Sequence, residues 1–198
     1  MTEFEAYLRL GFSHITDLNG YDHLLFIVAL CVVYQFSEWK KVLILVTAFT
    51  VGHSITLALA TLNLVNFSSD IIEFLIPVTI ALTAFGNLFN KPKMLYRPAD
   101  EKTPRLRYTM ALLFGLIHGL GFSTYLRSLL GKESSIFQPL LAFNIGLEIG
   151  QLAIVLIVLC IAWFFQNLLK VSRRDWILVV SGIVIGFAIT LIMKVNIF

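Results

Sequence analysis

The chain is built from long apolar stretches separated by short polar ones. Six apolar stretches lie near residues 18–36, 42–65, 71–89, 108–126, 138–165 and 176–197. Each is long enough for one helix across a bilayer, which takes about 20 residues. The pattern therefore predicts an all-α, polytopic membrane protein, a bundle of about six transmembrane helices forming a single domain over residues 1–198.

The first 15 residues have a different pattern. Glu3, Glu5 and Arg9 are interspersed with aromatic and aliphatic side chains. We expect residues 1–15 to form a short amphipathic N-terminal helix on the membrane surface.

Composition agrees with a membrane protein. Hydrophobic residues make up 58% of the chain and charged residues only 14%, whereas soluble domains carry about 25% charged residues. This composition excludes a water-soluble globule and a disordered chain. Six spans also leave no room for a soluble domain, so the function must lie within the bilayer or at its faces.

The basic residues predict the orientation of the chain. Eleven of the 15 lie in three loops that six crossings place on one side: Lys40, Lys41, Lys91, Lys93, Arg97, Lys102, Arg105, Arg107, Lys170, Arg173 and Arg174. By the positive-inside tendency this side is cytoplasmic, and both termini are extracytoplasmic. The net charge of +3 comes without a basic tail, so we expect no nucleic-acid partner.

Ionisable residues cluster by type in the apolar segments, where each costs about 2.5–3.5 kcal/mol at a helix centre unless it has a partner or a function. One histidine alone could simply bond a backbone carbonyl, but all four histidines lie in or beside these segments. The candidate metal ligands are His14, Asp17, Asp22, His23, His53, His118 and Glu148.

Polar residues on single helix faces support this cluster. Asn144, Glu148 and Gln151 share one face at i, i+4 and i+7, and Thr50 and Ser54 accompany His53. Interhelical hydrogen bonding is the alternative explanation for such a stripe. A rise of about 1.5 Å per residue places His53, His118 and Glu148 at one level, in a funnel open to the outside.

Two pairs of glycines predict close helix packing. Gly115 with Gly119, and Gly146 with Gly150, have the small-xxx-small spacing that lets helix backbones approach. We expect the fourth and fifth segments to pack against each other through these pairs.

Imidazole and carboxylate ligands suit divalent nickel, zinc, cobalt, iron or manganese. Copper(I) would favour thiolate and thioether ligands, and Cys31, Cys160 and the four methionines do not join the cluster by spacing.

Four motifs of the chain resemble the HupE/UreJ family, over about residues 10–160: Gly20-Tyr-Asp-His-Leu-Leu-Phe26, Ala48-Phe-Thr-Val-Gly-His-Ser-Ile-Thr-Leu57, Gly115-Leu-Ile-His-Gly-Leu-Gly-Phe122 and Phe143-Asn-Ile-Gly-Leu-Glu-Ile-Gly-Gln151. The resemblance implies a small bacterial inner-membrane metal permease, associated with nickel supply for hydrogenase or urease. It implies metal handling by Asp22, His23, His53, His118 and Glu148. His14 departs from the family pattern, because its spacing to Asp22 is longer and includes Asp17.

Two functions fit these observations. The first is a divalent-metal permease for nickel, zinc or cobalt, with the bilayer and the ion as partners and a homo-oligomer left open. The second is a membrane-embedded zinc hydrolase, whose fixed metal would activate a water molecule. The inward path is thin for a permease. Below His53 and His118 it contains Thr47, Thr50 and Thr109, while the fifth segment is almost wholly apolar over residues 152–165.

Overall fold

The computed structural model describes residues 2–89, 102–130 and 136–195, and within them all regular structure is helical. It also contains a 3₁₀ turn at Phe36–Glu38 and a π-helical turn at Phe164–Leu168. The α-helices are α1 Glu3–Thr16, α2 Asp22–Cys31, α3 Trp39–Thr61, α4 Ser69–Leu88, α5 Lys102–Gly121, α6 Ser123–Leu130, α7 Phe137–Trp163 and α8 Arg173–Lys194. The all-α prediction is confirmed.

Four helical segments of the described chain are long and apolar enough to cross a membrane: Phe36–Thr61, Ser69–Leu88, Phe137–Leu168 and Arg173–Lys194. The α5–α6 pair, bent by 50° at Phe122, makes a fifth if it counts as one span. The chain is therefore a polytopic membrane protein, as predicted.

The first expected span, 18–36, differs from expectation. It contains only the ten-residue helix α2, because residues 17–21 form an interruption between α1 and α2. Hydropathy counts apolar residues but does not register the break that Asn19 and Gly20 allow. The helix is about 15 Å long at 1.5 Å per residue, which is half of a hydrocarbon layer.

The N-terminal helix α1 is amphipathic, and its apolar face packs against α7. A capping box starts the helix, in which the Thr2 hydroxyl accepts from the Glu5 N–H at 3.3 Å and the Glu5 carboxylate accepts from the Thr2 N–H at 3.0 Å. A Cβ added at Gly11 would overlap the carbonyl of Phe143, and one at Gly146 would overlap the carbonyl of Leu8. The two backbones are thus in direct contact.

A second glycine seam joins α3 to α5. A Cβ at Gly52 would overlap the carbonyl of Leu112, and Cβ atoms at Gly115 and Gly119 would overlap the carbonyls of Phe49 and His53. The expectation that the fourth and fifth segments pack on each other is therefore wrong. Each glycine pair does serve close packing, but Gly115 and Gly119 face α3, and Gly146 and Gly150 face α1.

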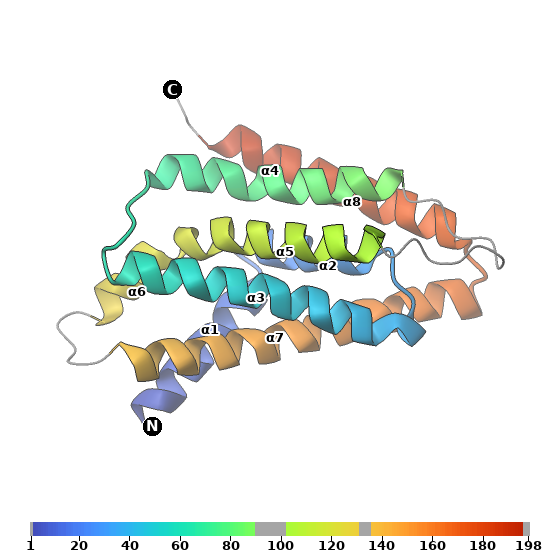
Figure 1. The fold of residues 1–198 in the computed structure, drawn as a ribbon. Helices are drawn as coiled ribbons and strands as arrows, with labels where there is room; N and C mark the ends of the chain where they lie inside the picture. The colour runs from blue at the N-terminus through green and yellow to red at the C-terminus, as the bar shows by residue number, and fades with distance from the viewer. Residues whose placement is uncertain (1, 90–101, 131–135, 196–198) are drawn as a thin grey trace.

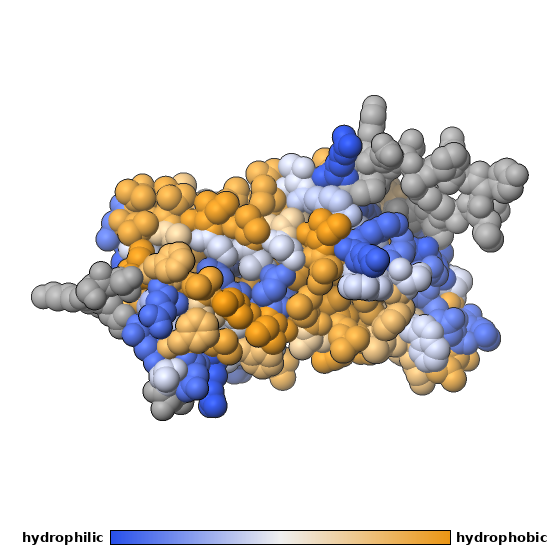
Figure 2. All heavy atoms as spheres, turned by 60° about the horizontal axis from the view of Figure 1, so that its bottom comes forward, coloured by the Kyte–Doolittle hydropathy of each residue, from blue (hydrophilic) through white to orange (hydrophobic). Residues whose placement is uncertain are grey.

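The helices form a flattened bundle, with α4 and α8 on one side, α2 and α5 in the middle, and α3 and α7 on the other side, crossed by α1 (Figure 1). We call the end where α3 and α8 begin the basic end, because Lys40, Lys41, Arg173 and Arg174 lie there. We call the opposite end, where α1 and α7 begin and α8 ends, the histidine end. Figure 2 shows a broad apolar belt between two polar ends.

Candidate metal centre

Three histidines from three helices converge inside the bundle. His14 lies in the last turn of α1, His23 is the second residue of α2, and His53 lies in α3. One ring nitrogen from each lies within 4.8 Å of the others. The interruption between α1 and α2 therefore brings His14 and His23 together beside His53.

The nitrogens of these rings are available as ligands. His14 Nε2, His23 Nε2 and both ring nitrogens of His53 are buried and have no hydrogen-bond partner in the described part of the chain. Nitrogens bound at 2.0–2.1 Å to one tetrahedral ion lie about 3.4 Å apart, so small side-chain rotations would bring the three onto a common ion. Buried polar groups are normally paired, so the three nitrogens are a candidate donor set for a metal.

Asp22 positions His23. Its Oδ1 accepts from the His23 backbone N–H at 2.9 Å and lies 3.1 Å from His23 Nδ1. A carboxylate that accepts a hydrogen bond from Nδ1–H fixes the orientation and tautomer of the ring and makes Nε2 a more basic ligand. We assign Nε2 as the nitrogen that His23 offers to a metal.

His118 lies beside the three histidines, but its Nε2 is already bonded. Its ring centroid is 5.2 Å from that of His23, and its Nε2 lies 3.0 Å from the Thr79 hydroxyl. Because this hydroxyl donates its own hydrogen to the Ile76 carbonyl at 2.7 Å, we assign His118 Nε2 as the donor. The Nδ1 atom of His118 is then deprotonated, buried and unpartnered.

Aromatic rings wall the cluster. The Phe122 ring lies 4.0 Å from that of His14, and the Phe143 ring stacks on His53 at 6.4 Å between centroids. The Phe49 ring packs against that of His118, with 5.1 Å between their centroids. Such an apolar shell limits water access and strengthens electrostatic interactions at the nitrogens.

An open hollow of about 590 Å³ leads to His14 from the histidine end. Ser13, Asp17, Asn19, Phe122 and Tyr125 are among its lining residues. Asp17 is exposed, and its Oδ1 accepts from the Asn19 backbone N–H at 2.9 Å. It therefore lies at the mouth of the hollow and is not part of the histidine group.

Glu148 belongs to a second polar group, between α3 and α7. The Thr47 hydroxyl donates to Glu148 Oε1 at 2.7 Å, and the Thr50 hydroxyl donates to Gln151 Oε1 at 2.7 Å. Thr47 lies six residues before His53 in α3, or about 9 Å nearer the basic end. Glu148 is thus deeper than the histidines, and the structure does not place it with them in the candidate ligand group.

Asn144 and Ser54, the other polar residues expected to support the site, are not hydrogen-bonded to the three histidines within the described part of the chain. Among the described residues, Asn144 Oδ1 and Glu148 Oε2 are buried and have no hydrogen-bond partner. Asn144 lies one turn nearer the histidine end of α7 than Glu148, so it continues the polar group toward the histidines. The Ser54 hydroxyl donates to the Thr50 carbonyl at 2.7 Å, within α3. Thr79 was not predicted from the sequence, although Thr79, Thr83 and Asn87 recur at i, i+4 and i+8 in the same apolar segment, and this spacing is the signal that could have revealed it.

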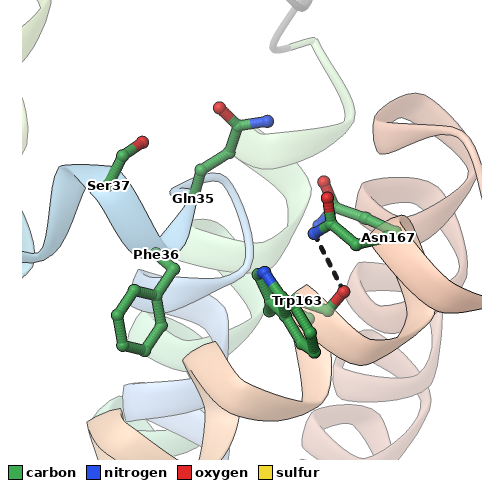
Figure 3. A pocket seen from close by; sticks show the side chains of 7 residues that line it. Gln35, Phe36, Ser37, Trp163 and Asn167 are labelled. Carbon is green, nitrogen blue, oxygen red and sulfur yellow. Dashed lines mark hydrogen bonds between the residues drawn. The ribbon is translucent and has the colours of Figure 1, made fainter.

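A separate hollow of about 350 Å³ lies at the basic end. Figure 3 shows Gln35, Phe36 and Ser37 on one segment and Trp163 and Asn167 on the other, with the Asn167 amide bonded to the Trp163 carbonyl at 3.0 Å. None of its lining residues is ionisable. The exposed rings of Phe36 and Trp163 are typical of a membrane interface, so this hollow is not the metal centre.

Fold and site together define a helical, multi-pass membrane protein with a buried three-imidazole site. Comparison with known families gives a match to the family described as HupE / UreJ protein, over residues 1–195. The chain belongs to the HupE/UreJ family. Searches of curated proteins and of solved structures returned no match.

Proposed function

We propose that the chain is a permease for a divalent transition metal, with nickel ahead of cobalt and zinc because of its family. The observation that carries this proposal is the convergence of three buried, unpartnered imidazole nitrogens on His14, His23 and His53. Neutral imidazole is a good ligand for each of these ions. The ion is the cargo, and the three rings replace part of its hydration shell.

The interruption between α1 and α2 supports transport. Broken helices in transporters place ligand-binding groups near the middle of the membrane. His14 ends one half-helix and His23 begins the other, about half a membrane thickness from the basic end. A binding site at that depth can be reached from either side after modest helix movements.

The hollow at the histidine end provides the entry. Asp17 at its mouth would attract a hydrated cation, and His14 lines its inner wall. The ion then passes from the exposed carboxylate to the buried nitrogens.

The oxygen-rich group between α3 and α7 provides the next step inward. The Glu148 carboxylate and the Thr47 hydroxyl lie between the histidines and the basic end. Asn144, next in sequence to Phe143, whose ring stacks on His53, lies at the level of the histidines. Beyond this oxygen-rich group the buried residues of the two helices are all apolar, Val42, Leu45, Val155 and Val158 among them, and they close the path in this conformation. Transport therefore requires α3 and α7 to separate at the basic end.

The orientation of the path follows from charge. Lys40, Lys41, Arg173 and Arg174 lie at the basic end, and by the positive-inside tendency they support a cytoplasmic location for this end. The entry hollow and both chain termini are then extracytoplasmic, and the proposed direction is import.

A zinc-dependent hydrolase is the second candidate. Three imidazole ligands with one open position are the donor set of catalytic zinc sites, and the hollow beside His14 would admit a small substrate. In that case the metal would stay bound and would activate water.

Equilibrium dialysis of the purified protein against nickel and zinc tests the proposed site. We expect one ion per chain, and we expect His53→Ala to weaken binding by more than the roughly 10–100-fold typical of removing a residue that only positions a ligand. Unchanged metal content in folded His14→Ala, His23→Ala and His53→Ala variants would exclude the site. A bound zinc that fails to exchange with free ion would favour the hydrolase.

A further inference from the structure

A groove unrelated to the histidines lies between α4 and α5, in the half of the bundle near the basic end. Its volume is about 270 Å³. Buried Leu45, Ala111 and Phe114 form its floor, while Leu82 and Leu106 on its rim are 54% and 63% exposed. The groove therefore opens sideways, toward the hydrocarbon of a membrane.

Gly86 keeps this groove open. It lies inside α4, where glycine costs about 1 kcal/mol relative to alanine, yet a Cβ added to it would meet nothing within 4 Å. Close backbone packing, which explains Gly52 and Gly115, does not explain this glycine. The space above Gly86 is available to a molecule other than the chain itself.

The positively charged side chain of Arg107 lies at the basic end of the groove. The Arg107 guanidinium lies 6.0 Å from the centre of the Tyr34 ring, and its Nη1 donates to Asn87 Oδ1 at 3.4 Å. No carboxylate forms an ion pair with Arg107 among the described residues. Within the described part of the chain, the guanidinium is therefore held by neutral groups and keeps N–H donors for an anion.

We propose that this groove binds an anionic phospholipid, with an acyl chain over Gly86 and the headgroup phosphate on Arg107. A groove that faces hydrocarbon takes an acyl chain, and guanidinium binds phosphate through paired, charge-assisted hydrogen bonds. Basic pockets between membrane helices bind anionic headgroups in the same way. Asn87, which accepts from Arg107, also donates through Nδ2 to the Ala29 carbonyl at 2.7 Å, so a headgroup on Arg107 would lie beside the contact between α4 and α2.

Thermal melting in detergent, with added phosphatidylglycerol or phosphatidylcholine, tests the proposal. We expect phosphatidylglycerol to raise the melting temperature of the wild type more than phosphatidylcholine does. Arg107→Gln should lose most of this difference, and Arg105→Gln, which changes an exposed arginine at the same end of α5, should keep it. An equal effect of the two lipids, or a full effect in Arg107→Gln, would overturn the proposal.

The acyl-chain position has its own test. Gly86→Leu fills the groove, and Gly182→Leu is the matched control, because Gly182 is also an exposed helical glycine with open space at its Cβ. In native mass spectrometry we expect Gly86→Leu to retain much less phosphatidylglycerol than Gly182→Leu. Equal retention would contradict an acyl chain in the groove, and a melting shift reproduced by inorganic phosphate alone would show an anion site without lipid.

Discussion

The Asp22 carboxylate holds the adjacent His23 at two points, accepting from its backbone N–H at 2.9 Å and lying 3.1 Å from its ring Nδ1. A single side chain thus bonds a backbone N–H in the first turn of α2 and orients the histidine there. The buried His23 Nε2 has no hydrogen-bond partner among the described residues. This arrangement is the usual second layer around a metal-bound histidine.

Asp22→Asn should therefore weaken metal binding without abolishing it. Asparagine keeps an acceptor but loses the negative charge, and we expect affinity to fall about 10–100-fold. Isothermal titration with nickel measures the effect. Asp70→Asn is the control, because it removes a carboxylate from the first turn of α4, and an equal loss in both variants would show a general charge effect.

Thr79→Val should reduce stability and leave the metal content unchanged. The substitution removes the partner of His118 Nε2, and a buried group left unpaired costs about 1–3 kcal/mol. Melting temperature and metal analysis of the same sample separate the two effects. A loss of metal at unchanged stability would instead make His118 part of the ligand set.

Gly146→Ala should displace α1 from α7. The new Cβ would overlap the Leu8 carbonyl, and overpacking of this kind costs about 1–3 kcal/mol. We expect a lower melting temperature and weaker nickel binding, because α1 carries His14. Gly182→Ala, with open space at its Cβ, should change neither property, and an unaffected Gly146→Ala variant would contradict the close contact.

The orientation can be tested by cysteine labelling in a chain in which Cys31 and Cys160 are replaced by alanine. Lys40→Cys, at the basic end, should react with a membrane-impermeant reagent only from the cytoplasmic side. Thr124→Cys, exposed on α6 at the histidine end, should react only from outside. The reverse pattern would invert the proposed direction of transport.

The helices that hydropathy located well are the uninterrupted ones. The expected stretches 42–65, 71–89, 138–165 and 176–197 correspond to α3, α4, α7 and α8. Residues 18–36 form only a half-length helix, because a windowed average does not detect the polar break at 17–21. The bend at Phe122 was missed for the same reason.

The site was predictable by residue type but not by depth or partner. Histidines in apolar segments pointed to His14, His23 and His53, which the structure brings together. The sequence placed Glu148 at the same depth as His53 and His118, because that estimate assumed where each helix begins. In the structure its hydrogen bond with Thr47 places Glu148 nearer the basic end. Glycine spacing likewise showed that a helix can be approached closely, but a linear pattern does not say by which neighbour.

Metal uptake into proteoliposomes tests the central claim most directly. The account predicts saturable nickel entry through the wild type, strong reduction in His53→Ala, and reduced but saturable entry in Glu148→Gln, because Glu148 lies on the onward path. Vesicles without protein provide the baseline. A wild type that conducts no nickel, cobalt or zinc down a gradient while retaining one unexchangeable zinc would contradict the permease.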